Sequence, residues 1–217
     1  MKWNSSYDPH IFGLISDAHI SPFNPVRNSN AKSILKILSE SGVEKILVAG
    51  DISDNFGSNG SFKHGQQYED DFLEYKKIVD QYPSDFLIVA SGNHDEFGVE
   101  DYNSENHYIL KYCDFYKNNE IYKKYENFLI SKVNYEDIEI FVMNPYHYPT
   151  VRAGVGYLMH MTTKMLDQIE KALSEKSNSS ARLLMTHFPV SFSNQHARSS
   201  SGKSLFEIMS SSNLTSI

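Results

Sequence analysis

The sequence predicts an α/β fold in which at least one sheet has parallel strands. Short runs of β-branched and apolar residues alternate with longer stretches whose apolar residues recur at helical spacing. This alternation is typical of βαβ units, in which a helix crosses over the sheet between two parallel strands. The chain has 217 residues, a length suited to one sizeable domain, and we expect residues 1–217 to form a single domain.

Three strands and two helices are predicted in the first half of the chain. Residues 11–15, 45–49 and 86–90 are short apolar runs, and we interpret them as buried strands. One helix lies between the first two strands and another between the second and third. Their apolar stripes are Ala31, Ile34, Leu35 and Leu38, followed by Gly42 as a stop signal, and Tyr68, Phe72, Tyr75 and Val79.

The second half predicts a different arrangement. Residues 128–133 and 138–143 resemble the two strands of a hairpin joined by a short turn. Residues 165–173 form one apolar stripe of a helix, for which Thr162 is a candidate N-cap. Three shorter elements are expected after it: a strand over 182–185, a helix over 204–209 and the beginning of a strand over 214–217.

Composition and charge exclude several classes of protein. Hydrophobic residues make up 40% and charged residues 22%, as in ordinary soluble globular proteins, and the net charge of −7 argues against a nucleic-acid partner. No apolar run reaches the roughly 18 residues that cross a bilayer, so we expect a soluble chain, cytoplasmic or lumenal. Cys113 is the only cysteine, which excludes an intrachain disulfide, and we interpret it as a buried structural thiol.

Residues with metal-binding side chains directly follow four of the predicted strands. In an open α/β sheet ligands bind at the carboxyl ends of the strands, so we expect these residues to converge. In chain order the clusters are Asp17-Ala18-His19, Gly50-Asp51-Ile52-Ser53-Asp54, Gly92-Asn93-His94-Asp95 and Thr186-His187.

The side chains in these clusters have the chemistry of a site for two metal ions. Carboxylate, imidazole and amide donors suit Mn, Fe or Zn better than an all-oxygen calcium site. Asp17 and His19 lie on the same side of an extended segment and can reach one ion. Asp51 can bridge two ions, and two ions about 4 Å apart can clamp a phosphoryl group. Separately the motifs are weak, but Gly92-Asn93-His94-Asp95 has only about one chance in a thousand of occurring in such a chain.

Taken in order, the four clusters resemble the signature of the calcineurin-like metallophosphoesterase superfamily, and the resemblance spans residues 11–217. It implies a two-sheet α/β/β/α sandwich and a dinuclear centre holding two divalent or trivalent ions (Mn, Fe or Zn). By this resemblance Asp17 and His19 would bind the first metal, and Asp51 would bridge. Asn93 and His187 would bind the second metal.

The resemblance also implies an activity. The chain would hydrolyse a phosphate mono- or diester by in-line attack of a metal-bridging hydroxide. His94 would be the catalytic histidine, protonating the leaving alkoxide or stabilising charge in the transition state. Asp54 would pair with His94 and set its tautomer.

Two departures from the family pattern matter. The closing Gly-His-x-His motif, which gives one more histidine to each metal, is absent from the 217 residues, and we expect a domain that is incomplete at its C-terminus or has an impaired site. Asn55 stands where protein phosphatases have the arginine that holds phosphate, which argues against a phosphoprotein substrate.

Several alternatives stay open at this stage. A catalytically impaired binding module with the same fold is the second hypothesis, and a nuclease is disfavoured by the acidic charge. Residues 16–25 and 65–71 resemble the transmembrane protein 62-like branch, in which membrane helices follow the phosphoesterase domain. His147, His160 and His196 could supply replacement metal ligands, although their spacing does not indicate it. Arg152 and Arg198 could hold a phosphate, but we interpret them as residues of solvated loops.

Overall fold

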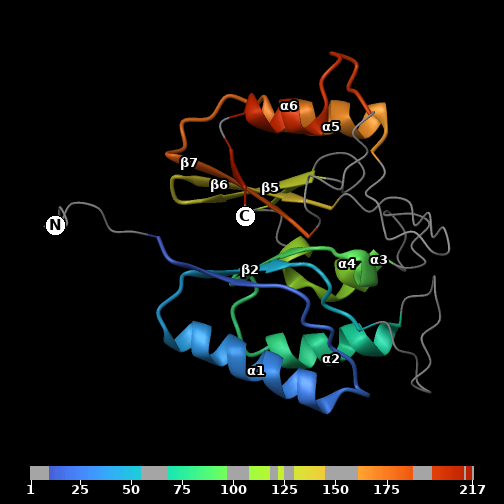
Figure 1. Ribbon diagram of the computed structural model, residues 1–217. Coiled ribbons are helices and arrows are strands. Elements are labelled where there is room, and N and C mark those ends of the chain that lie inside the picture. The colour runs from blue at the N-terminus through green and yellow to red at the C-terminus, as the bar shows by residue number, and fades with distance from the viewer. Residues whose placement is uncertain are drawn as a thin grey trace, which may run out of the picture.

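The computed structural model has four layers, a helical layer outside each of two sheets that face each other (Figure 1). Layers of this kind are the α/β/β/α sandwich that the sequence resemblance implied, and the expected fold class is confirmed. The structure describes residues 10–54, 68–96, 108–117, 122–124, 130–144, 161–187, 197–212 and 214–216.

The first sheet is parallel and has the order β1-β2-β3. Its strands are β1 (Phe12–Ile15), β2 (Lys45–Ala49) and β3 (Leu87–Ala90). Helices α1 (Pro25–Glu40) and α2 (Glu69–Val79) connect these strands and cover one face of the sheet (Figure 1). The three strands and both helices lie where the sequence predicted them, and Gly42 follows the end of α1 with a φ of 78°.

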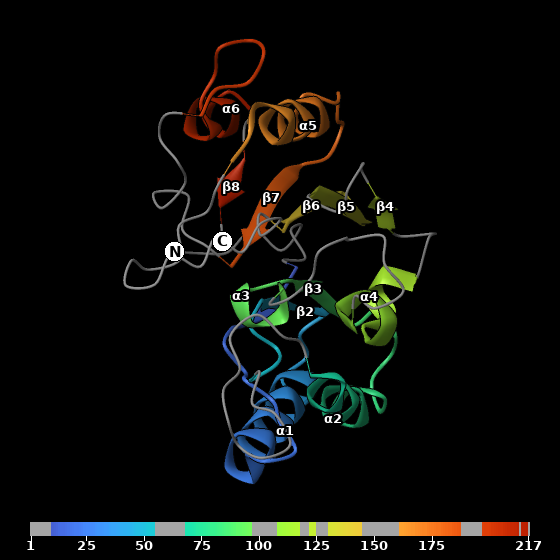
Figure 2. The ribbon, with the colours of Figure 1, turned by 90° about the vertical axis from the view of Figure 1, so that its right-hand side faces the viewer.

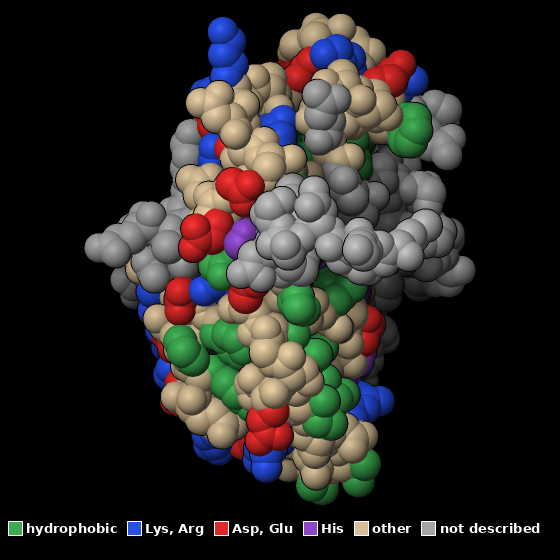
Figure 3. All heavy atoms as spheres, turned by 90° about the vertical axis from the view of Figure 1, so that its left-hand side faces the viewer, with side chains coloured by type: hydrophobic (Ala, Val, Ile, Leu, Met, Phe, Trp, Pro, Cys, Tyr) green, Lys and Arg blue, Asp and Glu red, His purple; other side chains and the backbone are tan. Residues whose placement is uncertain are grey.

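The prediction that residues 11–15 form a buried strand is wrong in one respect. β1 is an edge strand of the first sheet, so Ile11 and Leu14 are half exposed. Ile34 was expected in the buried stripe of α1, yet only Ala31 and Leu35 of that stripe are buried and Ile34 is 47% exposed. On the face shown in Figure 3, hydrophobic side chains gather over the half of the molecule that contains α1 and this sheet. The stripe is therefore narrower than its sequence pattern indicated, because the sheet ends at β1.

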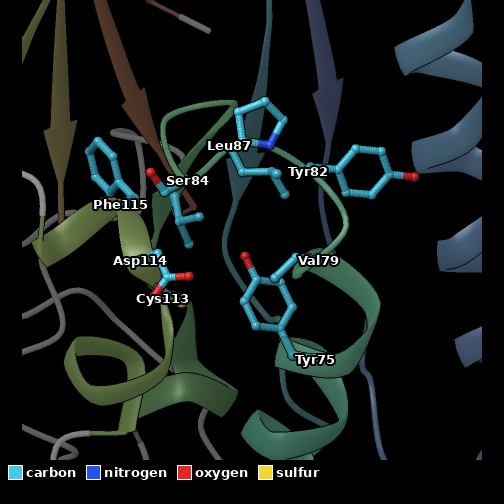
Figure 4. A pocket seen from close by; sticks show the side chains of 10 residues that line it. Tyr75, Val79, Tyr82, Ser84, Leu87, Cys113, Asp114 and Phe115 are labelled. Carbon is cyan, nitrogen blue, oxygen red and sulfur yellow. The ribbon is translucent and has the colours of Figure 1, made fainter.

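A group of short helices follows β3. They are α3 (Asn93–Glu96), α4 (Tyr108–Tyr112) and the 3-10 helix η1 (Asp114–Lys117). Cys113 between the last two is buried as predicted, and burial raises the pKa of its thiol well above the usual value. Tyr75 from α2 faces Cys113 and Asp114 across a pocket of about 20 Å³ (Figure 4), which has room for one water molecule.

The second sheet is mixed and has the order β4-β5-β6-β7-β8, which Figure 2 shows side by side. Its strands are β4 (Tyr122–Lys124), β5 (Ile130–Tyr135), β6 (Ile138–Met143), β7 (Ala181–Thr186) and β8 (Thr215–Ser216). β5 and β6 form the predicted antiparallel hairpin, whereas β7 and β8 run parallel to β6. The end of β7 lies beside the end of β2, since Nδ1 of His187 is 2.8 Å from the carbonyl oxygen of Ala49.

Two helices cover the outer face of the second sheet, α5 (Thr163–Leu173) and α6 (Leu205–Ser210) (Figure 2). The hydroxyl of Thr162 accepts a hydrogen bond from the Met165 N–H at 3.2 Å, so the predicted N-cap is confirmed. Ser204 caps α6 in a capping box with Glu207. None of the helices in the described ranges combines the length and the hydrophobicity that crossing a bilayer requires.

Apolar side chains form one core between the sheets and under α1 and α2, and another between the second sheet and its helices. Ile140 and Val142 of β6 point into the first core, while Phe141 and Met143 point into the second. Residues of β6 alternate between two buried faces, which explains why the whole strand is apolar except for Glu139. The first core joins the two sheets face to face, and this arrangement holds the strand ends together.

Candidate metal centre

The loops that follow β1, β2 and β7 meet at one edge of the two sheets. The Asp17 N–H donates to the Gly50 carbonyl at 3.1 Å, and the His19 N–H donates to the Asp51 carbonyl at 3.0 Å. His187 reaches this edge from the second sheet, with its Nδ1 atom 2.8 Å from the carbonyl oxygen of Ala49. The structure thus brings together residues that are up to 170 positions apart (187 − 17) in the sequence.

Asp51 lies at the centre of this cluster. Its Oδ1 atom accepts a hydrogen bond from the His94 N–H at 2.9 Å, which fixes the carboxylate. Its Oδ2 atom lies 3.4 Å from Nε2 of His187 and 3.8 Å from Nε2 of His19. Two ligands held about 2.1 Å from one ion are roughly 3.0–3.4 Å apart, so these separations are close to those of atoms that share a metal.

Two groups of potential ligands contain Asp51. One group is His19, Asp51 and His94, and the other is Asp17, Asp51 and His187, with the ligand atoms of each group within 4.8 Å of one another. Asp17 is also close to His19, with 3.8 Å between Oδ1 and Nε2. Asp51 is the residue that the two groups share, and the first group also contains His94, which was not predicted to be a metal ligand.

The tautomer of His187 follows from its hydrogen bond. A carbonyl oxygen only accepts, so the Nδ1 atom of His187 donates its proton to Ala49 and the neutral ring keeps a lone pair on Nε2. This lone pair faces the Oδ2 atom of Asp51. Two acceptor atoms facing each other favour a positive charge between them, and the donor set therefore fits a metal cation.

Backbone conformation at the centre is unusual. Of the four non-glycine residues with positive φ in the described ranges, three belong to this cluster: Asp17 (55°), His19 (45°) and Asp51 (53°). The left-handed region is unfavourable for residues with a Cβ atom, and such residues concentrate at functional sites. β1 and β2 are thus each followed by a turn in which residues of this cluster have a left-handed backbone conformation.

His94 lies against His19 and is held by the backbone of Asp54. The two imidazole rings are 4.5 Å apart between centroids and meet edge to face at 84°. The carbonyl oxygen of Asp54 lies 3.1 Å from Nδ1 of His94, so this nitrogen carries the proton and Nε2 is left for other chemistry. The contact that Asp54 makes with the His94 ring is therefore made by its main chain.

The carboxylate of Asp54 makes different contacts. Its Oδ1 atom lies 2.5 Å from Nη1 of Arg27 and 3.6 Å from Nδ1 of His19. Arg27 was not among the residues predicted to form the site. The one available signal was its place in the first turn of α1, where a positive charge is unfavourable because the helix dipole is positive there.

Asp95 is the last residue of the tetrapeptide Gly92-Asn93-His94-Asp95, and no function was predicted for it. Its side chain is fully buried and accepts hydrogen bonds from the N–H groups of Gly92 at 2.9 Å, Ser53 at 2.9 Å and Ile52 at 3.2 Å. These bonds tie the loop after β2 to the loop after β3. Asp95 thus fixes the backbone from which Asp51, His94 and Asn93, the first residue of α3, extend.

Burial shifts the titration of the central groups. Burial raises the pKa of Asp51 to about 6, and burial together with the nearby Asp51 raises the pKa of Asp95 to about 6. The pKa of His19 is lowered, chiefly by burial and then by the adjacent His94. A neutral His19 at pH 7 is the form that binds metal.

Two glycines allow the loops to approach each other. A Cβ atom at Gly92 would lie 2.2 Å from Oδ1 of Asp51 and 2.4 Å from its backbone nitrogen. A Cβ atom at Gly50, whose φ is 80°, would lie 2.8 Å from the side chain of His187. The close approach of these loops therefore depends on residues without side chains at both positions.

A hollow of about 190 Å³ lies beside Asp17. It is bounded by the end of β1 and the first half of α1, and its polar lining includes Arg27. Its lining residues are Ile15, Ser16, Asp17, Ala18, Arg27, Asn30, Ala31 and Ile34.

Of the other residues considered from the sequence for metal or phosphate binding, the structure describes only Arg198. His147, His160, His196, Arg152 and Asn55 lie outside the described residues. Arg198 is exposed, and its Nη1 donates to the carbonyl of Ala197 at 2.9 Å.

The sequence and the structure were compared with known proteins. No curated protein sequence matches the chain. Among solved structures, one reported as "Structural and biochemical characterization of Yfce, a phosphoesterase from E. coli" has 15% sequence identity and a TM-score of 0.32. The match covers 70% of this chain and 66% of the other, just under two thirds of its length. The sequence model of the calcineurin-like phosphoesterase family matches residues 11–210. The chain belongs to the calcineurin-like phosphoesterase family.

Proposed function

We propose that this chain is a metal-dependent hydrolase of phosphate mono- or diesters with a centre for two metal ions. The observation that carries the proposal is the position of Asp51, whose Oδ2 atom faces Nε2 of both His19 and His187. Family membership supports a hydrolase acting on phosphate esters. The two ligand groups that share Asp51 support the number of ions.

The proposed ligands are Asp17, His19, Asp51, Asn93 and His187, with Asp51 shared. When bound, the two ions would neutralise phosphoryl oxygens and make a water molecule a stronger nucleophile at neutral pH. We favour Mn, Fe or Zn because the donors combine imidazole nitrogens with carboxylate oxygens. Asn93 is included because it begins α3 between Gly92 and His94, both of which contact Asp51.

His94 is the proposed proton donor. Its Nδ1 proton is engaged with the Asp54 carbonyl, so a proton held on Nε2 is the one that passes to the leaving alkoxide oxygen as the P–O bond breaks. The Asp54 carbonyl keeps the ring orientation constant during this transfer. His94 also belongs to a potential ligand group, so it could bind a metal instead of donating a proton. The experiment below distinguishes these two roles.

The hollow beside Asp17 is the proposed site for the alcohol part of the ester. It adjoins a proposed metal ligand and combines apolar walls, from Ile15, Ala31 and Ile34, with the cation of Arg27. Its 190 Å³ exceeds the roughly 150 Å³ of a cavity that accepts benzene, so a single ring fits. A small aromatic or aliphatic phosphate ester is therefore a suitable first substrate.

A catalytically impaired binding module is the second candidate function. It would keep the fold of the family and the two ligand groups that share Asp51. The resemblance of residues 16–25 and 65–71 to the transmembrane protein 62-like branch is compatible with either function. A module of this kind would bind metal and phosphate without turnover.

The test compares Asp51→Asn with His94→Asn in the presence of Mn²⁺. We expect the first variant to lose metal binding, measured by isothermal titration calorimetry, and the second to keep it. The His94→Asn variant should hydrolyse p-nitrophenyl phosphate and bis(p-nitrophenyl) phosphate about 10²- to 10⁴-fold more slowly. Loss of metal in both variants would assign His94 to the metal instead, and metal binding without turnover by the wild-type protein would favour the binding module.

A further inference from the structure

Arg27 occupies a position where a positive charge needs a compensating partner. It is the third residue of α1, and its N–H donates to the side chain of the capping residue Asn24 at 3.2 Å. Cations are unfavourable in the first turn of a helix. The Arg27 guanidinium contacts the carboxylate of Asp54 at 2.5 Å between Nη1 and Oδ1.

Asp54 in turn requires a cation. Its side chain is only 5% exposed, and a buried carboxylate is costly unless it is paired and hydrogen-bonded. In the described part of the chain, Arg27 is the lysine or arginine that forms an ion pair with Asp54. The pair thus fixes where the Asp54 carboxylate lies.

The fixed carboxylate faces His19. The Nδ1 atom of His19 is buried without a hydrogen-bond partner in the described residues, and Oδ1 of Asp54 lies 3.6 Å from it. The Nε2 atom on the other side of the ring faces Asp17 and Asp51, each at 3.8 Å. Metal-binding histidines commonly have a carboxylate at the nitrogen away from the metal, which orients the ring and makes it a better ligand.

We infer that Arg27 is a positioning residue of the metal centre, which acts through Asp54 on His19. Its guanidinium holds the Asp54 carboxylate opposite Nδ1 of His19, so that the ring presents its Nε2 lone pair toward Asp17 and Asp51. This inference rests on the proposed function, because it assumes that His19 binds a metal. In this arrangement the carboxylate of Asp54 orients His19, whereas the backbone carbonyl of Asp54 contacts His94.

The experiment is Mn²⁺ titration of wild type, Arg27→Gln, Arg27→Lys and Asp54→Asn by isothermal titration calorimetry at pH 7. The matched control is Lys36→Gln, which removes a positive charge from the same helix where Lys36 makes an exposed contact with Glu40 at 3.8 Å. Loss of a residue that supports a ligand typically lowers metal affinity about 10- to 100-fold. We expect a weakening of this size in Arg27→Gln, partial rescue in Arg27→Lys and affinity within about twofold of wild type in the control.

A double-mutant cycle distinguishes positioning from general destabilisation. If Arg27 acts through Asp54, the Arg27→Gln/Asp54→Asn variant should bind Mn²⁺ about as weakly as either single variant, since coupled residues are not additive. Additive losses, or wild-type affinity in Arg27→Gln, would overturn the inference. A cooperative thermal unfolding transition of each metal-free variant shows that the variant is folded. If Arg27→Gln is not folded, the Mn²⁺ affinity of Arg27→Lys is compared with that of the wild type instead. No Mn²⁺ binding by the wild-type protein would instead refute the proposed function itself.

Discussion

Replacing Gly92 by alanine should disrupt the metal centre by steric contact alone. Gly92 is not among the glycines with positive φ, so its backbone conformation suits alanine and only the space is lacking. The added Cβ atom would lie 2.2 Å from Oδ1 and 2.4 Å from the backbone nitrogen of Asp51, where real contacts do not fall below 3.0 Å. Rotation of the Asp51 side chain relieves the first contact but leaves the second, so the loop after β2 must move by at least 0.6 Å (3.0 − 2.4).

A displacement of this size has two measurable consequences. Overpacking of this kind costs about 1–3 kcal/mol of folding free energy, which lowers Tm by about 2–4 °C per kcal/mol in a protein of this length. The same shift moves Asp51 relative to His19 and His187, and we expect Mn²⁺ affinity to fall by about tenfold or more. Calorimetric titration and thermal unfolding measure the two effects.

Gly42→Ala is the matched control for this prediction. A Cβ atom there meets nothing within 4 Å, but the φ of 78° makes alanine unfavourable. This variant should therefore lose about 1 kcal/mol of stability and keep its Mn²⁺ affinity. Wild-type affinity in Gly92→Ala, or an equal loss in both variants, would show that the close approach of Gly92 to Asp51 does not support the metal centre.

Three further predictions follow from the buried groups of the site. Asp95→Ala leaves the N–H groups of Ile52, Ser53 and Gly92 without their acceptor. It should lower the free energy of unfolding, measured in urea, by about 2–5 kcal/mol. The control is Asp80→Ala, which removes an exposed carboxylate and should change this free energy by less than about 1 kcal/mol. Without metal, Asp51→Asn should raise Tm at pH 7, because burial raises the pKa of Asp51 from 3.8 to about 6 and its ionised form destabilises the fold. This gain in Tm should shrink as the pH falls below about 6, where Asp51 becomes protonated in the folded state, and should be gone below 3.8, where it is protonated in the unfolded state as well. A gain in Tm that does not depend on pH would contradict the raised pKa of Asp51. Saturating Mn²⁺ at pH 7 should raise the Tm of the wild type and leave that of Asp51→Asn unchanged.

Most of the fold was predictable because the apolar patterns in this chain are regular. The runs that became β2 and β6 are buried strands, and Thr162 caps α5 as its position indicated. The run that became β7 was also expected to be buried, but only Leu184 and Met185 of that strand are. The short elements α3, α4 and β4 were not predicted, since three to five residues are too few to show a period. Exposure of Leu14 was also not predictable, because it depends on which strand lies at the sheet edge.

The candidate site was predictable only in part. Its ligand types were visible because each follows a strand directly, but contacts made through space left little trace in the sequence. Arg27 and Asp54 meet across 27 positions, and no local pattern links them. From the residue types, the Asp54 carboxylate was expected to pair with His94. In the structure the partner is the backbone carbonyl of Asp54, a group that every residue type has and that the sequence therefore does not reveal.

Anomalous diffraction from a crystal soaked in Mn²⁺ tests the central claim most directly, namely that Asp51 is shared by two ions. We expect two anomalous peaks about 3.5–4 Å apart, each within about 2.3 Å of an Asp51 carboxylate oxygen. One peak should lie next to Nε2 of His19 and the other next to Nε2 of His187. A single peak, or peaks that lie away from the Asp51 carboxylate, would contradict the account.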